Sequence, residues 1–298
     1  MSLQPIGAID LPRHPAGGFD HGDVHLPTGR VFVAHTANGT VEVLDGEQCR
    51  HLSTIPGCPE ASGVLCTDRG LVFAAARGGG RVLVIDALAA AVVREVMVGP
   101  KPNGLAWDGR RKHLLVADVE DLRARLIDPG NGACLAAVVL PGRPRWAAYD
   151  AAADRFLINI REPACVILLS ADSGEAAGRW PVSSPGPHGL DLDLDTARAF
   201  VACDDGMVVA LDLAGGHQVG RGPIAGEPDA VWYNPAAARL YVAVGRPGLV
   251  DVLDIRSMEL LERIVTEEGA HTTAFDRLRQ RLYVFLPRSG CASVYAER

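Results

Sequence analysis

The sequence predicts an all-β fold, a seven-bladed β-propeller with four antiparallel strands in each blade. Three observations lead to this prediction. A short motif recurs along the chain at nearly constant intervals, each copy divides into four strand-like segments, and the last copy lacks one segment that the N-terminus can supply. We expect one domain that spans residues 1–298.

The recurring motif is a proline, a polar residue and an apolar segment, followed by a polar turn and a second apolar segment. In residues 102–118 it reads PNGLAWDGRRKHLLVAD. From the copy at Pro59 onward, the successive prolines are 43, 42, 43 and 41 residues apart. With two weaker copies, the predicted blades start near residues 19, 59, 102, 144, 187, 228 and 270. A period of roughly 40 to 45 residues is typical of propeller blades.

Each copy contains four short segments rich in β-branched residues and separated by Gly, Pro, Asn and Asp. In the third copy these are NGLAWD, HLLVAD, RARLID and ACLAAVVLPG. No segment has the length and the 3.6-residue periodicity of a helix, so we predict strands throughout. A lone four-stranded sheet with two apolar faces can bury both only between neighbouring sheets, which favours a closed ring.

The two ends of the chain predict how the ring closes. The seventh copy supplies only three segments, HTTAFD, RLYVFL and CASVYA, whereas residues 6–11 (IGAIDL) look like a fourth strand ahead of the first copy. Pairing of this N-terminal strand with the last blade would remove an exposed sheet edge. We therefore predict that residues 6–11 complete the last blade.

Composition excludes several classes of partner. Because 36 acidic residues outnumber 29 basic ones, the net charge is −7, which argues against nucleic acid. Apolar stretches such as residues 87–93 are far shorter than the ~20 residues of a membrane span. The seven cysteines are scattered without a CxxC pair, which favours reduced thiols. We expect a cytoplasmic monomer, with a periplasmic protein that has lost its leader as the alternative.

The repeats resemble those of a known family. RLYVAVGRPGLVDVLDI and GRVFVAHTANGTVEVLD are similar to the YVTN repeat of the YncE-like seven-bladed propellers, and the resemblance covers essentially the whole chain. It implies the seven-bladed fold. It says little about function, because members of that family have varied binding roles.

The residue that follows each proline, or the equivalent Phe19 and Ala270, is polar or charged in all seven copies. In a propeller this residue starts the innermost strand at one mouth of the central channel. We expect a shared mouth lined by Asp20, Glu60, Asn103, Arg145, His188, Asp229 and His271, with His21 beside it. One interpretation is that these residues are polar because the channel is wet. The other is that they bind a small polar ligand or a protein partner.

Part of this ring has the chemistry of a metal site. His188, Asp229, His271 and Asp20 come from consecutive blades, and imidazoles with carboxylates are ligands for a divalent ion. No other cofactor is expected. In the HGDVH segment, His21, Asp23 and His25 could share one face, but we favour a turn role for His25, which occupies the turn-starting position of Asp108 in the third copy.

A second resemblance supports an enzymatic alternative. PNGLAWD is similar to a blade of the regucalcin and gluconolactonase propellers, whose metal ligands would correspond to Asn103, in part to Asp229, and to Glu60 outside its usual context. Arg145 departs from that pattern, and those enzymes have six blades. The alternative function is a metal-dependent hydrolase, lactonase or lyase in which His188, Asp229 or His271 is the ligand or general base, and an arginine such as Arg145 binds an anionic substrate.

The loops between the second and third segments of each copy add charges to the same rim. These are Arg77, Asp118, Glu120, Asp121, Arg161, Glu162, Asp204, Asp205, Arg246 and Arg288. They are either solvated loop charges or a rim that orients a polar ligand. The chain contains no GxSxG motif that would indicate a serine nucleophile.

Overall fold

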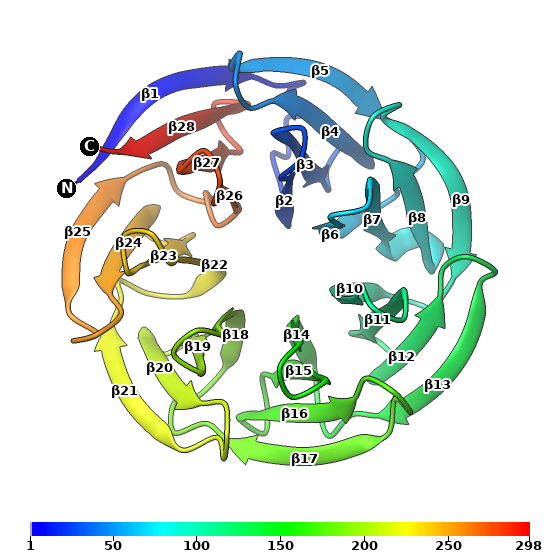
Figure 1. Ribbon diagram of the computed structural model, residues 1–298. Coiled ribbons are helices and arrows are strands. Elements are labelled where there is room, and N and C mark those ends of the chain that lie inside the picture. The colour runs from blue at the N-terminus through cyan, green and yellow to red at the C-terminus, as the bar shows by residue number, and fades with distance from the viewer. Residues whose placement is uncertain (1) are drawn as a thin grey trace.

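The computed structural model describes residues 2–298 and consists of seven four-stranded antiparallel sheets arranged around a central axis (Figure 1). The predicted seven-bladed propeller is therefore confirmed. In blades one to six the strands follow one another outward from the axis in sequence order. Within residues 2–298 the one helical segment is η1 (Arg77–Gly79), and no helix is long and apolar enough to cross a membrane.

The strands of the first four blades are given from the innermost outward. Blade one contains β2 (Gly22–His25), β3 (Arg30–His35), β4 (Thr40–Asp45) and β5 (Arg50–Ile55). Blade two contains β6 (Ala61–Cys66), β7 (Leu71–Ala76), β8 (Arg81–Asp86) and β9 (Ala91–Met97). Blade three contains β10 (Pro102–Asp108), β11 (His113–Asp118), β12 (Arg123–Asp128) and β13 (Ala133–Val139). Blade four contains β14 (Pro144–Asp150), β15 (Arg155–Ile160), β16 (Cys165–Ser170) and β17 (Ala176–Pro181).

The remaining three blades follow the same order. Blade five contains β18 (Pro187–Asp193), β19 (Arg198–Cys203), β20 (Met207–Asp212) and β21 (Gln218–Pro223). Blade six contains β22 (Pro228–Asn234), β23 (Arg239–Val244), β24 (Leu249–Asp254) and β25 (Leu260–Val265). Blade seven contains β26 (Thr273–Asp276), β27 (Arg281–Leu286), β28 (Cys291–Glu297) and, on the outside, β1 (Leu3–Asp10).

The N-terminal strand closes the ring as predicted. β1 pairs antiparallel with β28 from Leu3 opposite Glu297 to Asp10 opposite Cys291, and the two termini lie side by side in Figure 1. The strand begins at Leu3, earlier than the predicted residues 6–11. The Glu297 carboxylate also accepts a hydrogen bond of 2.7 Å from the Tyr241 hydroxyl, which ties the closing strands to blade six.

The hydrophobic core lies between the blades. Seven clusters of buried side chains are present, and each contains residues of two neighbouring blades. The cluster between blades seven and one joins Ile9 of β1, Val31 of β3 and Phe285 of β27. The ring is therefore held by a continuous sequence of interfaces, so the loss of one blade would expose two apolar faces.

An arginine at the start of the second strand links many blades to the next. Its guanidinium donates to a main-chain carbonyl of the following blade, as Arg30 does to Ala87 (2.7 Å) and Arg198 does to Ile255 (2.9 Å). Arg281 of blade seven makes the same contact with Gly46 of blade one, across the closure. These contacts explain why an arginine precedes the apolar segment in several copies of the motif.

Candidate functional site

The polar residue after each proline leaves the regular strand pairing. The register of β14 with β15 shifts between Pro144 and Ala147, and that of β18 with β19 shifts between Pro187 and Leu190. β10 and β22 show the same irregularity. A bulge leaves the extra residue unpaired and redirects its side chain. The bulges therefore free the side chains of residues 103, 145, 188 and 229 from the sheet at the entrance to the channel.

Asp229 is the centre of one polar network at this mouth. Its Oδ1 accepts a hydrogen bond of 2.9 Å from the indole N–H of Trp146, and its Oδ2 lies 2.8 Å from Nδ1 of His271. Nε2 of His188 is 3.4 Å from the same Oδ1, and Nδ1 of His188 is 2.9 Å from Oδ1 of Asp204. Both ring nitrogens of His188 thus face carboxylates.

The charges of this network shift one another's ionisation. Burial alone would raise the pKa of Asp229, but the imidazoles of His188, His271 and His21 hold it well below the usual range. Burial would lower the pKa of His271, and the hydrogen bond and charge of Asp229 raise it instead. Opposite charges are therefore favoured on Asp229 and His271.

A second network occupies the opposite side of the mouth. Nη2 of Arg77 donates to Oδ2 of Asp20 at 2.6 Å and to Oδ1 of Asn103 at 2.8 Å. Arg77 is carried by the helical turn η1 between β7 and β8, so a rim loop of blade two joins residues of blades one and three. Nε2 of His21 lies 3.4 Å from Oδ1 of Asp20.

Trp146 connects the two networks across the channel. The rings of His21 and Trp146 are stacked with centroids 4.3 Å apart and an interplanar angle of 13°. His21 precedes the innermost strand of blade one and Trp146 belongs to that of blade four, on opposite sides of the ring (Figure 1). The stacked rings border an interior cavity of about 120 Å³ beyond the mouth. They therefore separate the mouth from the rest of the channel.

Sequence reasoning missed Trp146, although a signal for it exists. The position two residues after the proline holds Gly104, Gly189 and Ala230 in other blades. A Cβ atom at either glycine would lie 2.3 Å from a main-chain oxygen of the next blade, that of Arg145 or that of Asp229. The innermost strands are thus closely packed there, and the small residues leave the centre free for one large ring.

Other predicted site residues stand apart from these networks. Glu60 is exposed, has a φ of 49° and precedes β6 directly. The side chain of Arg145 makes no hydrogen bond or ion pair within residues 2–298, and its Nε is buried without a partner.

In the HGDVH segment, Asp23 accepts a hydrogen bond of 2.7 Å from the Cys66 main chain, and burial raises the pKa of Asp23 to about 6. His25 contacts Thr28 at 2.7 Å in the turn between β2 and β3, so the three residues do not form one ligand set.

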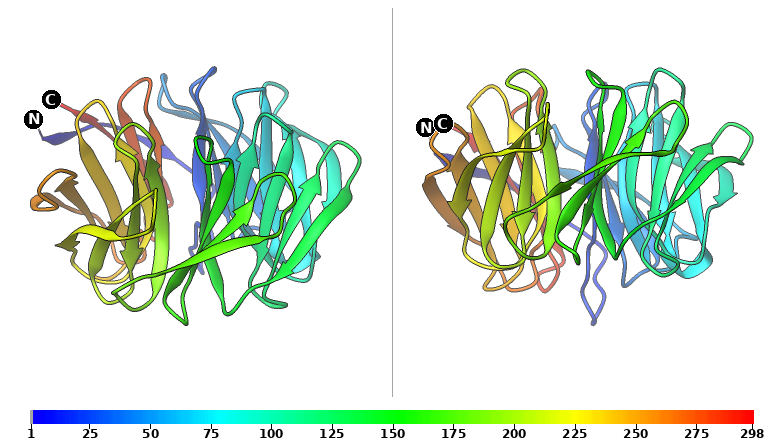
Figure 2. Two further views of the ribbon diagram at one scale, coloured as in Figure 1. Left: turned by 60° about the horizontal axis from the view of Figure 1, so that its bottom comes forward. Right: turned by 90° about the horizontal axis from the view of Figure 1, so that it is seen from below.

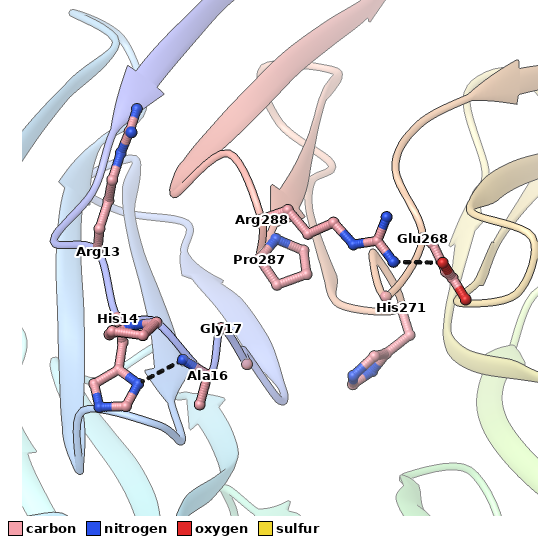
Figure 3. A pocket seen from close by; sticks show the side chains of 11 residues that line it. Arg13, His14, Ala16, Gly17, Glu268, His271, Pro287 and Arg288 are labelled. Carbon is pink, nitrogen blue, oxygen red and sulfur yellow. Dashed lines mark hydrogen bonds and ion pairs between the residues drawn. The ribbon is translucent and has the colours of Figure 1, made fainter.

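Two adjoining cavities open at the mouth. One of about 420 Å³ is bordered by His188, Asp229, Arg246 and His271. The other, of about 860 Å³, shares His271 and Gly269 with it and is bordered across the gap by the segment that joins β1 to β2 (Figure 3). This segment projects from one face of the ring (Figure 2, right). Such volumes suit a small molecule.

The predicted metal ligands do not form a ligand set in this arrangement. Within residues 2–298, no group of three or more His, Cys, Asp and Glu side chains could hold a metal ion. The reason is visible at Asp229, whose two oxygens are engaged by Trp146 and His271. A metal at Asp20, His188, Asp229 and His271 stays a prediction that would require these hydrogen bonds to be exchanged for metal contacts.

A separate titratable cluster lies within blade one. The carboxylate of Glu42 on β4 is fully buried, and it contacts His35 (3.3 Å), Thr40 (2.7 Å), His51 (2.9 Å) and Thr54 (2.5 Å). These contacts more than offset the effect of burial and lower the pKa of Glu42 from 4.5 to about 2. Because every partner belongs to the same blade, we assign the cluster a structural role.

The comparisons with known proteins identify the fold class. No family model and no curated protein matches the chain. Among solved structures, a chain of Kuenenia stuttgartiensis hydrazine synthase is similar, with a TM-score of 0.84, 16% identity, and coverage of 96% of this chain and 97% of that one. Because 1797 chains match, the architecture is widespread. Together with the seven blades, this likeness defines the chain as a seven-bladed β-propeller, and at 16% identity it shows the fold alone.

Proposed function

We propose that this chain is a binding propeller that takes up a small polar ligand in a cup at one mouth of its channel. The observation that carries the proposal is the stacking of His21 on Trp146 from opposite blades. Because these rings separate the mouth from the interior, the mouth is a recess with a floor. A recess of this kind can surround a ligand more completely than an open pore.

The walls of the cup support the same function. His188, Asp229 and His271 border the cavity of about 420 Å³, and Trp146 donates its hydrogen bond to Asp229. A few fixed polar groups around such a cavity provide orientation and specificity. The resemblance of the repeats to YncE-like propellers is consistent with binding.

A fluorescence screen of small polar compounds tests the proposal, because a ligand that contacts Asp229 perturbs the hydrogen-bonded indole of Trp146. We expect a hit to change the emission of the wild-type protein and to raise its Tm. His271→Gln should weaken both effects, whereas the control His217→Gln, at an exposed turn in blade five, should leave them unchanged. A hit that His271→Gln and Trp146→Phe both leave at full affinity would place binding elsewhere and overturn the proposal.

A further inference from the structure

Arg145 is a half-buried cation at the mouth, and its guanidinium lacks an acceptor. It lies in the bulge of β14 between Asn103 and His188 of the neighbouring blades, and it is half-buried. Its side chain has no hydrogen bond or ion pair to any residue in the range 2–298, and its Nε is inaccessible to solvent. A guanidinium carries five N–H donors, and burial of such a donor without an acceptor costs free energy. The site is therefore incomplete without an acceptor.

The nearest carboxylates are already engaged. Asp204 contacts His188 at 2.9 Å and Arg161 at 2.6 Å. Asp229 is held by Trp146 and His271. Both acids attract Arg145 through space, but neither forms an ion pair with it. Within residues 2–298 no acceptor reaches the guanidinium of Arg145, and a bound ligand would supply one.

The pairing of charges at the mouth favours an anion at Arg145. Arg77 is paired with Asp20, Arg161 with Asp204 and His271 with Asp229, whereas Arg145 has no carboxylate partner within residues 2–298. A half-buried guanidinium without a carboxylate partner attracts a small anion to that place.

We propose that the ligand of the mouth is a small molecule with a carboxylate or phosphate group, and that Arg145 binds this group. The inference rests on the proposed function of the mouth and adds the chemical class of the ligand. A planar guanidinium pairs with either oxyanion through two parallel hydrogen bonds. His188, on the blade next to Arg145, and His271 border the cavity of about 420 Å³ and are in place to contact the remainder of the molecule.

Calorimetric titration at low salt with two probes, citrate and inorganic phosphate, tests the inference and distinguishes the two oxyanions. We expect at least one probe to bind the wild-type protein. Arg145→Gln should weaken this binding roughly 10- to 100-fold, the range for a lost hydrogen bond to a charged group. Arg145→Lys, which keeps the charge, should give an intermediate loss. The control Arg94→Gln changes the net charge equally but is exposed on the outer strand β9, and it should bind like the wild type.

Three outcomes would overturn the inference. Equal affinity of wild type and Arg145→Gln for the probes would show that Arg145 is not the binding group. Loss of binding in Arg94→Gln as large as in Arg145→Gln would indicate general charge attraction. If neither probe binds while a neutral or cationic compound passes the Trp146 fluorescence test, the mouth binds ligands but the anion class is wrong. If Arg145→Gln does not fold, Arg145→Lys decides the first outcome.

Discussion

Replacement of Glu42 by glutamine measures how much a buried charge contributes to this fold. Glu42 lies on β4, and its side chain has no solvent exposure. Oε1 accepts from the Thr40 hydroxyl at 2.7 Å, and Oε2 accepts from Thr54 at 2.5 Å and from His51 at 2.9 Å. Glutamine keeps the shape but carries no charge, and its amide N–H₂ faces groups that donate. The substitution therefore removes the charge and places donors against donors.

The pKa of Glu42 gives the magnitude. A decrease from 4.5 to about 2 on folding corresponds to about 3 kcal/mol of stability at neutral pH, at ~1.4 kcal/mol for each pH unit. Because the pKa is lowered in the folded state, this stability is fully present above pH 4.5. It is lost as the pH falls toward 2, where the folded state also binds the proton.

Urea denaturation followed by circular dichroism checks this expectation. At pH 7 we expect Glu42→Gln to lower the free energy of unfolding by about 2–3 kcal/mol, and the difference from wild type should shrink between pH 4.5 and pH 3. The control Glu95→Gln removes a half-exposed carboxylate paired with Arg81 and should cost less than about 1 kcal/mol. A Glu42→Gln protein within about 0.5 kcal/mol of wild type at pH 7, or a difference independent of pH, would refute the reasoning.

Three further predictions concern the mouth, the closure and the cysteines. The pKa of Asp229 is lowered in the folded state, so its contribution to stability is lost as the pH falls. The pKa of His271 is raised, so its contribution is lost as the pH rises. Asp229→Asn should therefore lower the free energy of unfolding in urea most between pH 3.8 and 6.5, and less on either side. Ile9→Ala on the closing strand should cost about 2–5 kcal/mol by the same assay, whereas Gln4→Ala at an exposed position of that strand should cost little; equal effects would argue against the packing of β1. In the native protein a thiol reagent should label the exposed Cys134 quickly and Cys58 slowly, since burial raises the pKa of Cys58 to about 12; mass spectrometry of the labelled peptides reads the order.

Much of the fold was predictable because it depends on local patterns that repeat. The interval between prolines fixed the number of blades, and the missing segment of the seventh copy placed the N-terminal strand beside β28. The turn-starting aspartates were also readable. Oδ1 of Asp108 accepts from the main chain of Arg110 at 2.9 Å, as an Asx turn requires. Such features need only a few neighbouring residues, so a single sequence contains them.

The site was only partly predictable because it depends on which blades face each other. The motif placed His188, Asp229 and His271 at one mouth, and the structure brings them together around Asp229. The motif gave no indication that Trp146 would cross the channel to His21, since the two residues belong to blades four and one. Arg77 was expected only as a rim charge, and its link between Asp20 and Asn103 depends on the turn η1.

The asymmetry of the mouth follows from one departure in an otherwise regular repeat. Where blades three and five have Gly104 and Gly189, blade four has Trp146, and the neighbouring strands leave no room for a Cβ at either glycine. A large ring fits at this level only by lying across the channel, where it meets His21 and donates to Asp229. Arg145 is the residue before Trp146, so the bulge that sends the indole across the channel also places the guanidinium at the rim. The closed floor and the unpaired cation thus have a common origin in β14, which makes blade four the part of the ring in which substitutions should alter ligand binding most.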